Sequence, residues 1–133
     1  MQVSQQVSPL SAPGAVRMPG TGGVFAAGCP SRVVLDHVTS KWGVLVLVAL
    51  ADGPQRWSEL RRRAEGISEK MLAQTLRTLE ADGFVLRDAQ PVIPPRVDYS
   101  LTERGAELVA LLLPLFGWVV ANADDIVGDR DPA

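Results

Sequence analysis

The chain has 133 residues, 47% of them hydrophobic and 21% charged, with a formal net charge of −2; these proportions are typical of one soluble globular domain. Cys29 is the only cysteine, which excludes an internal disulfide, and Cys29 with the single His37 falls short of the four ligands of a structural zinc site. The slightly acidic total gives no overall basic signature of nucleic-acid binding.

The sequence lacks the common motifs of enzymes and the features of membrane proteins. The sequence has no glycine-rich phosphate loop, no serine, histidine and aspartate set and no metal cluster, so we expect neither an enzyme nor a cofactor. Its N-terminus lacks the features of a signal peptide, and its longest apolar run, residues 108–120, is shorter than the ~20 residues that cross a bilayer. We expect a cytoplasmic, nucleoid-associated protein without a membrane partner.

The N-terminal segment differs in composition from the rest. Residues 1–28 are rich in Ser, Pro, Gly, Gln and Ala, and Arg17 is their only charged residue. This composition predicts a disordered tail, in which Met18 is an alternative start. The folded domain is predicted over residues 29–127, and residues 128–133 form a second disordered tail.

Two helices are predicted to open the domain. Ser31 can cap a short first helix. Thr39 or Ser40 can cap a second helix over residues 41–51. This second helix is apolar nearly all round, which predicts a central and enclosed position.

A helix-turn-helix is predicted next. Ser58 can cap a third helix over residues 58–65, and Ser68 can cap a fourth over residues 68–82. Gly83 follows directly and is suited to ending the fourth helix.

A hairpin and a last helix complete the chain. Residues 84–88 and 96–101 alternate in the manner of strands, and the three prolines of residues 89–95 predict a stiff tip. Thr102 can cap a helix over residues 103–127. A helix-turn-helix followed by a hairpin predicts a winged helix-turn-helix, mainly α with a small β wing (α+β).

The fourth helix has two distinct faces. Leu72, Leu76 and Leu79 lie within about 60° of one another, which predicts a buried stripe. The opposite face carries side chains that suit the major groove, where Arg and Lys donate to guanine, Gln pairs with adenine and apolar groups touch the thymine methyl. The DNA contacts predicted on this helix are Ser68, Lys70, Met71, Gln74, Thr75 and Arg77.

The charge is unevenly distributed. Residues 56–77 carry six Lys and Arg against three Glu, whereas residues 101–133 carry two Arg against six acids. The acidic balance therefore lies away from the predicted DNA surface. We add Arg61 and Arg62 of the third helix, and Arg96 where the hairpin tip meets its second strand, to the predicted DNA contacts.

A second function remains open on the residue pattern alone. Any amphipathic surface helix has a polar outer face, and the local positive charge is modest. Winged helices also serve as protein-interaction modules that bind no specific DNA.

Several motifs resemble one known family. They are Cys29-Pro30, Lys41-Trp42, SELRR at residues 58–62, ISEKML at residues 67–72 and PPRVDYSLT at residues 94–102. In these the chain resembles the HxlR-type regulators, which are winged-helix proteins related to the MarR group. The resemblance covers about residues 29–118.

The resemblance implies a cytoplasmic homodimer that binds a palindromic DNA operator, and we expect a repressor. The chain departs from the family pattern in having Thr39 and Ser40 where glycines are common and Trp57 where Phe is usual. None of these positions belongs to the predicted DNA contacts.

The resemblance also implies that the first and last helices build the dimer. The last helix is apolar on more sides than a small domain can enclose, although it could instead only close the core of a monomer. Pro114 is expected to kink it. The predicted dimer contacts are Leu108, Leu112, Leu115, Phe116 and Val119.

Two kinds of effector are considered. In some members that resemble this chain, a cysteine at the position of Cys29 senses oxidants or electrophiles, which requires an accessible thiolate. Arg32, one turn on, favours such a thiolate, but a buried or idle cysteine is the alternative. The rival effector is a small apolar or aromatic ligand near the dimer interface, lined by Trp42, Phe116 and Trp118.

Overall fold

Five helices and three strands lie in residues 25–128, the part of the chain that the computed structural model describes. The chain divides into two units between Asp36 and His37. The elements are α2 (Pro30–Val38), α3 (Lys41–Leu50), β1 (Gln55–Arg56), α4 (Trp57–Arg63), α5 (Glu69–Ala81), β2 (Val85–Gln90), β3 (Arg96–Leu101) and α6 (Glu103–Gly128).

Both predicted tails fall largely outside this range. Of residues 1–28 only the last four are described, and of residues 128–133 only Gly128. The alternative start at Met18 also lies outside the described residues.

The first helix begins earlier than a cap at Ser31 predicts. α2 starts at Pro30, so Ser31 lies in its first turn and does not cap it. The Cys29 carbonyl accepts the first backbone hydrogen bonds, from the amides of Arg32 (3.0 Å) and Val33 (3.2 Å). Proline is favoured at a first helical position because it has no N–H to leave unpaired.

α3 occupies the centre of the second unit, as predicted. Ser40 caps it, and the Ser40 hydroxyl accepts a hydrogen bond from the Gly43 amide (3.1 Å). Val46, Leu47 and Leu50 are almost completely buried. The core around them combines leucines of α4 and α5 with the base of the sheet and the first turns of α6.

The third helix also begins earlier than predicted. α4 starts at Trp57 and not at Ser58, because β1 holds the chain extended up to Arg56. The Arg56 amide donates to Glu59 Oε1 (2.8 Å), which satisfies one of the free donors of the first turn. α4 ends at Arg63, so Glu65 lies beyond it.

The sheet has three antiparallel strands in the order β1-β3-β2, where the sequence predicts two. β1 pairs with β3, with Gln55 opposite Tyr99. Gln55 is 8% exposed, and its side-chain amide donates to the Ala49 carbonyl. Tyr99 is buried and Val97 and Leu101 pack against the core, so these three alternating residues of β3 share the inner face of the sheet.

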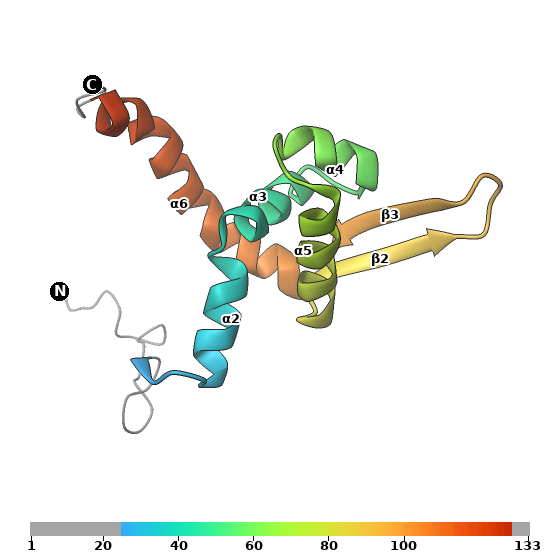
Figure 1. Cartoon of the computed structure of the whole chain (residues 1–133), viewed down its shortest axis with the longest axis horizontal. Coiled ribbons are helices and arrows are strands. Elements are labelled where there is room, and N and C mark those ends of the chain that lie inside the picture. Colours follow the sequence, from blue (N-terminus) through green and yellow to red (C-terminus); the bar gives the residue numbers. More distant parts are fainter. Residues whose placement is uncertain (1–24, 129–133) are drawn as a thin grey trace. The chain divides into compact units, whose positions relative to one another are not determined.

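β2 and β3 form the wing. They extend together away from the helices (Figure 1), and their register runs from Val85 opposite Leu101 to Gln90 opposite Arg96. The helix-turn-helix of α4 and α5 thus leads directly into a hairpin. The predicted winged helix-turn-helix is confirmed.

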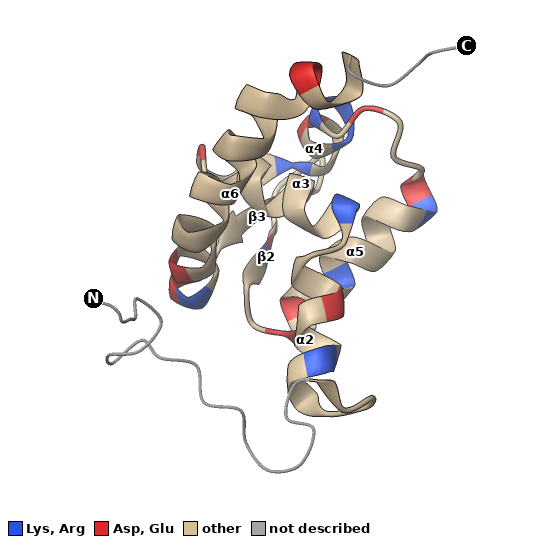
Figure 2. Ribbon diagram, turned by 90° about the vertical axis from the view of Figure 1, so that its left-hand side faces the viewer, with Lys and Arg blue, Asp and Glu red and all other residues tan. Residues whose placement is uncertain are grey.

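α6 is a continuous helix that does not break at Pro114. Thr102 caps it as predicted, and the Thr102 hydroxyl accepts a hydrogen bond from the Gly105 amide (3.0 Å). Residues 108–123 carry no charge, and the middle of α6 is tan in Figure 2. Most of this helix is exposed after its first three turns.

By length and composition alone, α6 could cross a membrane, since an 18-residue window of it has a mean hydropathy of 1.8. Its first three turns, however, bury Gly105, Val109 and Leu112 in the core of the winged helix. The charge-free residues 108–123 would span about 24 Å at ~1.5 Å per residue, less than the ~30 Å of a hydrocarbon core. α6 is better described as a helix whose apolar outer half is uncovered in the single chain.

Candidate nucleic-acid interface

α5 is anchored in the core along one face. Ser68 is its N-cap, and the Ser68 hydroxyl accepts a hydrogen bond from the Met71 amide (3.0 Å). Leu72, Leu76 and Leu79 are buried, as the predicted stripe requires. The helix axis and its rotation are therefore set by packing.

The opposite face of α5 is open. Lys70, Met71, Gln74 and Arg77 are exposed, whereas Thr75 is half-buried. Neither Lys70 nor Arg77 forms an ion pair with any residue of the described chain. Both cations are thus available to an external anion or base edge.

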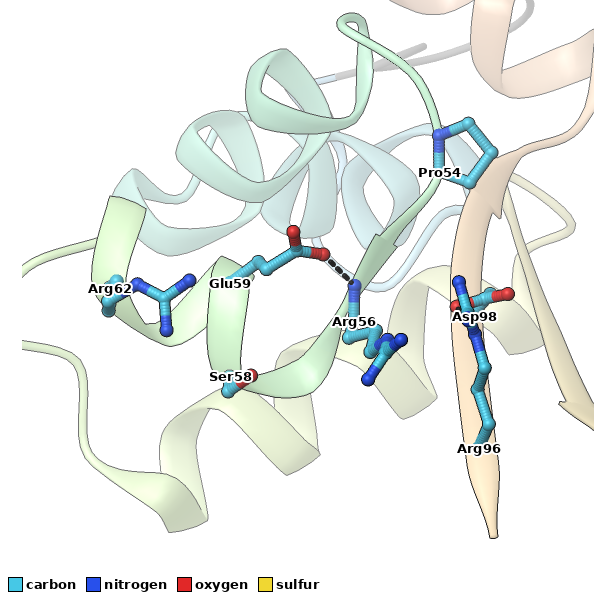
Figure 3. A pocket seen from close by; sticks show the side chains of 7 residues that line it. All are labelled: Pro54, Arg56, Ser58, Glu59, Arg62, Arg96 and Asp98. Carbon is cyan, nitrogen blue, oxygen red and sulfur yellow. Dashed lines mark hydrogen bonds and ion pairs between the residues drawn. The ribbon is translucent and has the colours of Figure 1, made fainter. Parts of the chain in front are cut away.

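The other predicted contacts lie on α4 and the wing. Arg61 bonds Glu69 across the turn (3.2 Å), and both side chains are exposed, so the pair is weak. Arg96 donates from Nε to Asp98 Oδ1 (3.2 Å). Arg62 has no ion-pair partner within residues 25–128. Arg62 and Arg96 line one polar hollow between α4 and β3 (Figure 3).

Arg56 lines the same hollow, and the sequence does not predict it as a contact. It ends β1, where pairing places it opposite Asp98 of β3. A two-residue strand has no periodicity of its own. The only sequence signal is the local excess of arginine, which does not say which arginines converge.

The C-terminal end of α5 is held by side chains from outside the helix. Asp82 is the C-cap, and its Oδ2 lies 2.6 Å from Nδ1 of His37. The Arg104 guanidinium donates to the Asp82 carbonyl (3.0 Å). Both ends of α5 are therefore fixed, the first by Ser68 and the last by these two contacts.

The family model of the HxlR-like helix-turn-helix matches residues 37–126, which include α3, the helix-turn-helix, the wing and most of α6. The chain belongs to this family. The predicted resemblance is confirmed.

Relatives of this HxlR-like chain are transcriptional regulators by name. It is 53% identical over 110 residues to the HTH-type transcriptional regulator YtfH of Escherichia coli, covering 83% of this chain and 87% of the relative. The solved structure of the transcriptional regulator YtfH of Salmonella typhimurium superposes with a TM-score of 0.75 at 52% identity, covering 80% and 96% of the two chains. The oxidised form of the redox regulator HypR superposes with a TM-score of 0.65 at 37% identity, covering 77% and 99%.

The single cysteine of this HxlR-like chain lies in the first unit. The Cys29 side chain is half-buried and free. The Arg32 guanidinium, expected to favour its thiolate, donates instead to the Phe25 carbonyl (3.0 Å). Within residues 25–128, Cys29 is therefore partly accessible and has no arginine partner.

Not all of the α6 residues predicted as dimer contacts are exposed in the single chain. Leu112 is 8% exposed and packs in the core of its own chain, and Leu108 packs against that core. Leu112 is therefore removed from the interface set. Leu115 (58% exposed) and Val119 are uncovered, and Phe116 is half-buried.

An apolar groove of about 270 Å³ runs between α3 and α6. Phe116 lines it, but Trp42 packs against the core, and Trp118 is exposed outside the groove. The three aromatic residues predicted to share a ligand site are thus not brought together. The groove is lined by Lys41, Val44, Leu45, Leu112, Leu115, Phe116 and Val119.

Proposed function

We propose that this HxlR-like protein is a sequence-specific DNA-binding regulator in which α5 reads the major groove. The outer face of α5 carries this proposal, because Lys70, Gln74 and Arg77 are exposed there and the two cations have no ion-pair partner within residues 25–128. Bidentate donors on a rigid helix are the usual means of reading base edges. Repression and a cytoplasmic location are parts of the same proposal.

We further propose that it acts as a homodimer on a palindromic operator. Leu111, Leu115, Trp118 and Val119 are exposed on α6 and fall within an arc of about 100°. A contiguous apolar face of this kind indicates a protein partner, and a second copy related by a twofold axis is the commonest one. Two copies of α5 would then enter successive major grooves, about 34 Å apart.

The base-reading role can be tested in α5 itself. We expect Gln74→Ala and Arg77→Ala to lower discrimination between the operator and a random duplex by about 1–3 kcal/mol each. Fluorescence anisotropy with promoter DNA from the gene's own locus measures both affinities. Glu80→Ala, further along α5 and off this face, serves as the control.

Two results would change the assignment. Equal loss on operator and random duplex would make these side chains phosphate contacts and not base readers. A wild-type protein that prefers no promoter fragment over random DNA would favour the alternative, a winged helix that binds other proteins.

A redox signal is proposed for Cys29, prompted by the likeness to HypR, which is named a redox regulator. The chain has one thiol, so diamide can link it only to another molecule: two thiols lose two electrons and two protons to diamide and form one disulfide. We expect diamide to reduce operator binding at least about tenfold, with a disulfide-linked dimer on a non-reducing gel. Cys29→Ser should abolish both effects, and a variant that still responds would remove Cys29 from the mechanism.

A further inference from the structure

A polar hollow of about 360 Å³ lies where the helix-turn-helix meets the wing. Its walls come from β1 and α4, which follow one another in the chain, and from β3, which lies more than thirty residues later (Figure 3). The lining residues are Pro54, Arg56, Ser58, Glu59, Arg62, Arg96 and Asp98.

Both acids of the hollow are engaged by neighbours. Glu59 Oε1 accepts from the Arg56 amide (2.8 Å), which ties it to the start of α4. Asp98 accepts from Arg96 Nε (3.2 Å) and from Gln90 Nε2 (2.9 Å). These contacts hold the walls in place and partly neutralise the two carboxylates.

The arginines are less occupied than the acids. Three of them face two carboxylates, and neither Arg56 nor Arg62 forms an ion pair within the described part of the chain. Arg56 points across the hollow toward β3, and Arg62 extends from α4 (Figure 3). Ser58 adds an exposed hydroxyl between them. Guanidinium groups with a hydroxyl donor suit a phosphate.

The position of the hollow favours a phosphate that belongs to a large molecule. Arg56, Ser58, Arg62 and Arg96 are all exposed, so a DNA strand can approach them from solvent. In a docked helix-turn-helix the first helix crosses the DNA backbone, and here that helix is α4. A strand passing from the groove of α5 toward the wing would run over the hollow.

We propose that Arg56, Ser58, Arg62 and Arg96 together bind one phosphodiester of the DNA backbone. This rests on the proposed function, because it requires α5 to face the same DNA. The site sets the position of the wing on the duplex without reading a base. A free phosphate compound shares the chemistry, so the experiment must separate the two sources.

Salt titrations test whether the arginines share a phosphate. Each neutralised phosphate adds about 0.9 to the slope of log K against log salt. We expect Arg56→Ala and Arg62→Ala to weaken operator and random duplex by the same factor. Each should lower the slope by about 0.9 per protomer, or about 1.8 for the proposed homodimer. The double variant should lower the slope no further than either single variant, because each protomer loses the same single phosphate. Arg63→Ala removes the same charge from the same helix, but Arg63 is bound to Asp52 and should leave the slope unchanged.

Neutral backbone substitutions locate the phosphate. Operator duplexes with a methylphosphonate at one position at a time should weaken wild-type binding at several positions. At one of these positions, and at its symmetry-related position, the methylphosphonate should not weaken DNA binding by the Arg56→Ala protein. A double variant that lowers the slope by about twice as much as either single variant, or an Arg56→Ala protein sensitive at every wild-type position, would overturn the shared site.

Two further outcomes separate this proposal from its rivals. Saturable binding of inorganic phosphate in calorimetry, lost in Arg56→Ala with an unchanged salt slope on DNA, would assign the hollow to a free phosphate compound. Equal wild-type affinity for operator and random duplex would overturn the specific regulator but leave the slope test of the hollow valid. A wild-type protein that binds no duplex would overturn both.

Discussion

Leu115→Asp is expected to convert the protein into a monomer and to weaken operator binding by about 100-fold to about 10⁴-fold. Leu115 is 58% exposed in the single chain and lies in the middle of the apolar arc of α6. At a twofold interface the substitution places two carboxylates in an apolar contact, where each would have no partner. Only one α5 helix would then bind the operator at a time. The affinity that is gained by linking two α5 helices in one dimer would be lost.

The measurement combines light scattering with anisotropy on the same samples. Ala110→Asp is a matched control, because it adds the same charge to an exposed position on the other side of α6, about 140° from Leu115. It should remain dimeric and bind normally. A Leu115→Asp protein that is monomeric yet binds its operator with wild-type affinity would contradict the dimer proposal.

Gly105→Ala is expected to destabilise the fold by about 1–3 kcal/mol, the usual range for overpacking a core. A Cβ at Gly105 would overlap the Phe84 carbonyl oxygen and lie 3.2 Å from Leu101 Cδ2. The Phe84 carbonyl cannot move freely, because it accepts a hydrogen bond from the Thr102 amide (3.0 Å). The close approach of α6 to the start of the wing therefore requires glycine.

The expected change in the free energy of unfolding has the opposite sign to that of an ordinary Gly→Ala substitution in a helix. Gly→Ala inside a helix ordinarily stabilises by roughly 0.5–1 kcal/mol, so Gly105 should show the reverse. Gly117→Ala is the control: it lies in the same helix, nothing is within 4 Å of its added Cβ, and it faces away from Leu115. Thermal melts should place Gly105→Ala about 4–8 °C below wild type per kcal/mol lost. Equal melting temperatures for the two variants would show that the contact at Gly105 carries no constraint.

Local patterns in the sequence predict most of the helices and the wing. The caps and the leucine stripe of α5 are both local features, so the predicted helix over residues 68–82 agrees with Glu69–Ala81 and its two caps. β1 could not be predicted, because two residues become a strand only by pairing with β3, more than forty positions later. The early start of α4 follows from that same pairing.

The candidate site was predicted as a set of residues but not as an arrangement. Periodicity identifies the outer face of α5, and the structure keeps its side chains exposed apart from the half-buried Thr75. Whether Leu112 faces its own core or a second chain depends on where α6 crosses α3, which no local pattern reveals. Arg56 joins Arg62 and Arg96 only through the sheet, so the hollow had no sequence signature.

The contacts of Asp82 restrict how α5 can move when an effector binds. Asp82 ends α5, and it is bonded to His37 near the end of α2 and to Arg104 in the first turn of α6. A rotation of α5 about its own axis would break these two contacts and expose Leu79. A displacement of α5 that keeps both contacts would therefore carry His37 and the first turn of α6 with it. In the proposed homodimer, a change in the angle between the two α5 helices would be enough to misalign one of them with its major groove.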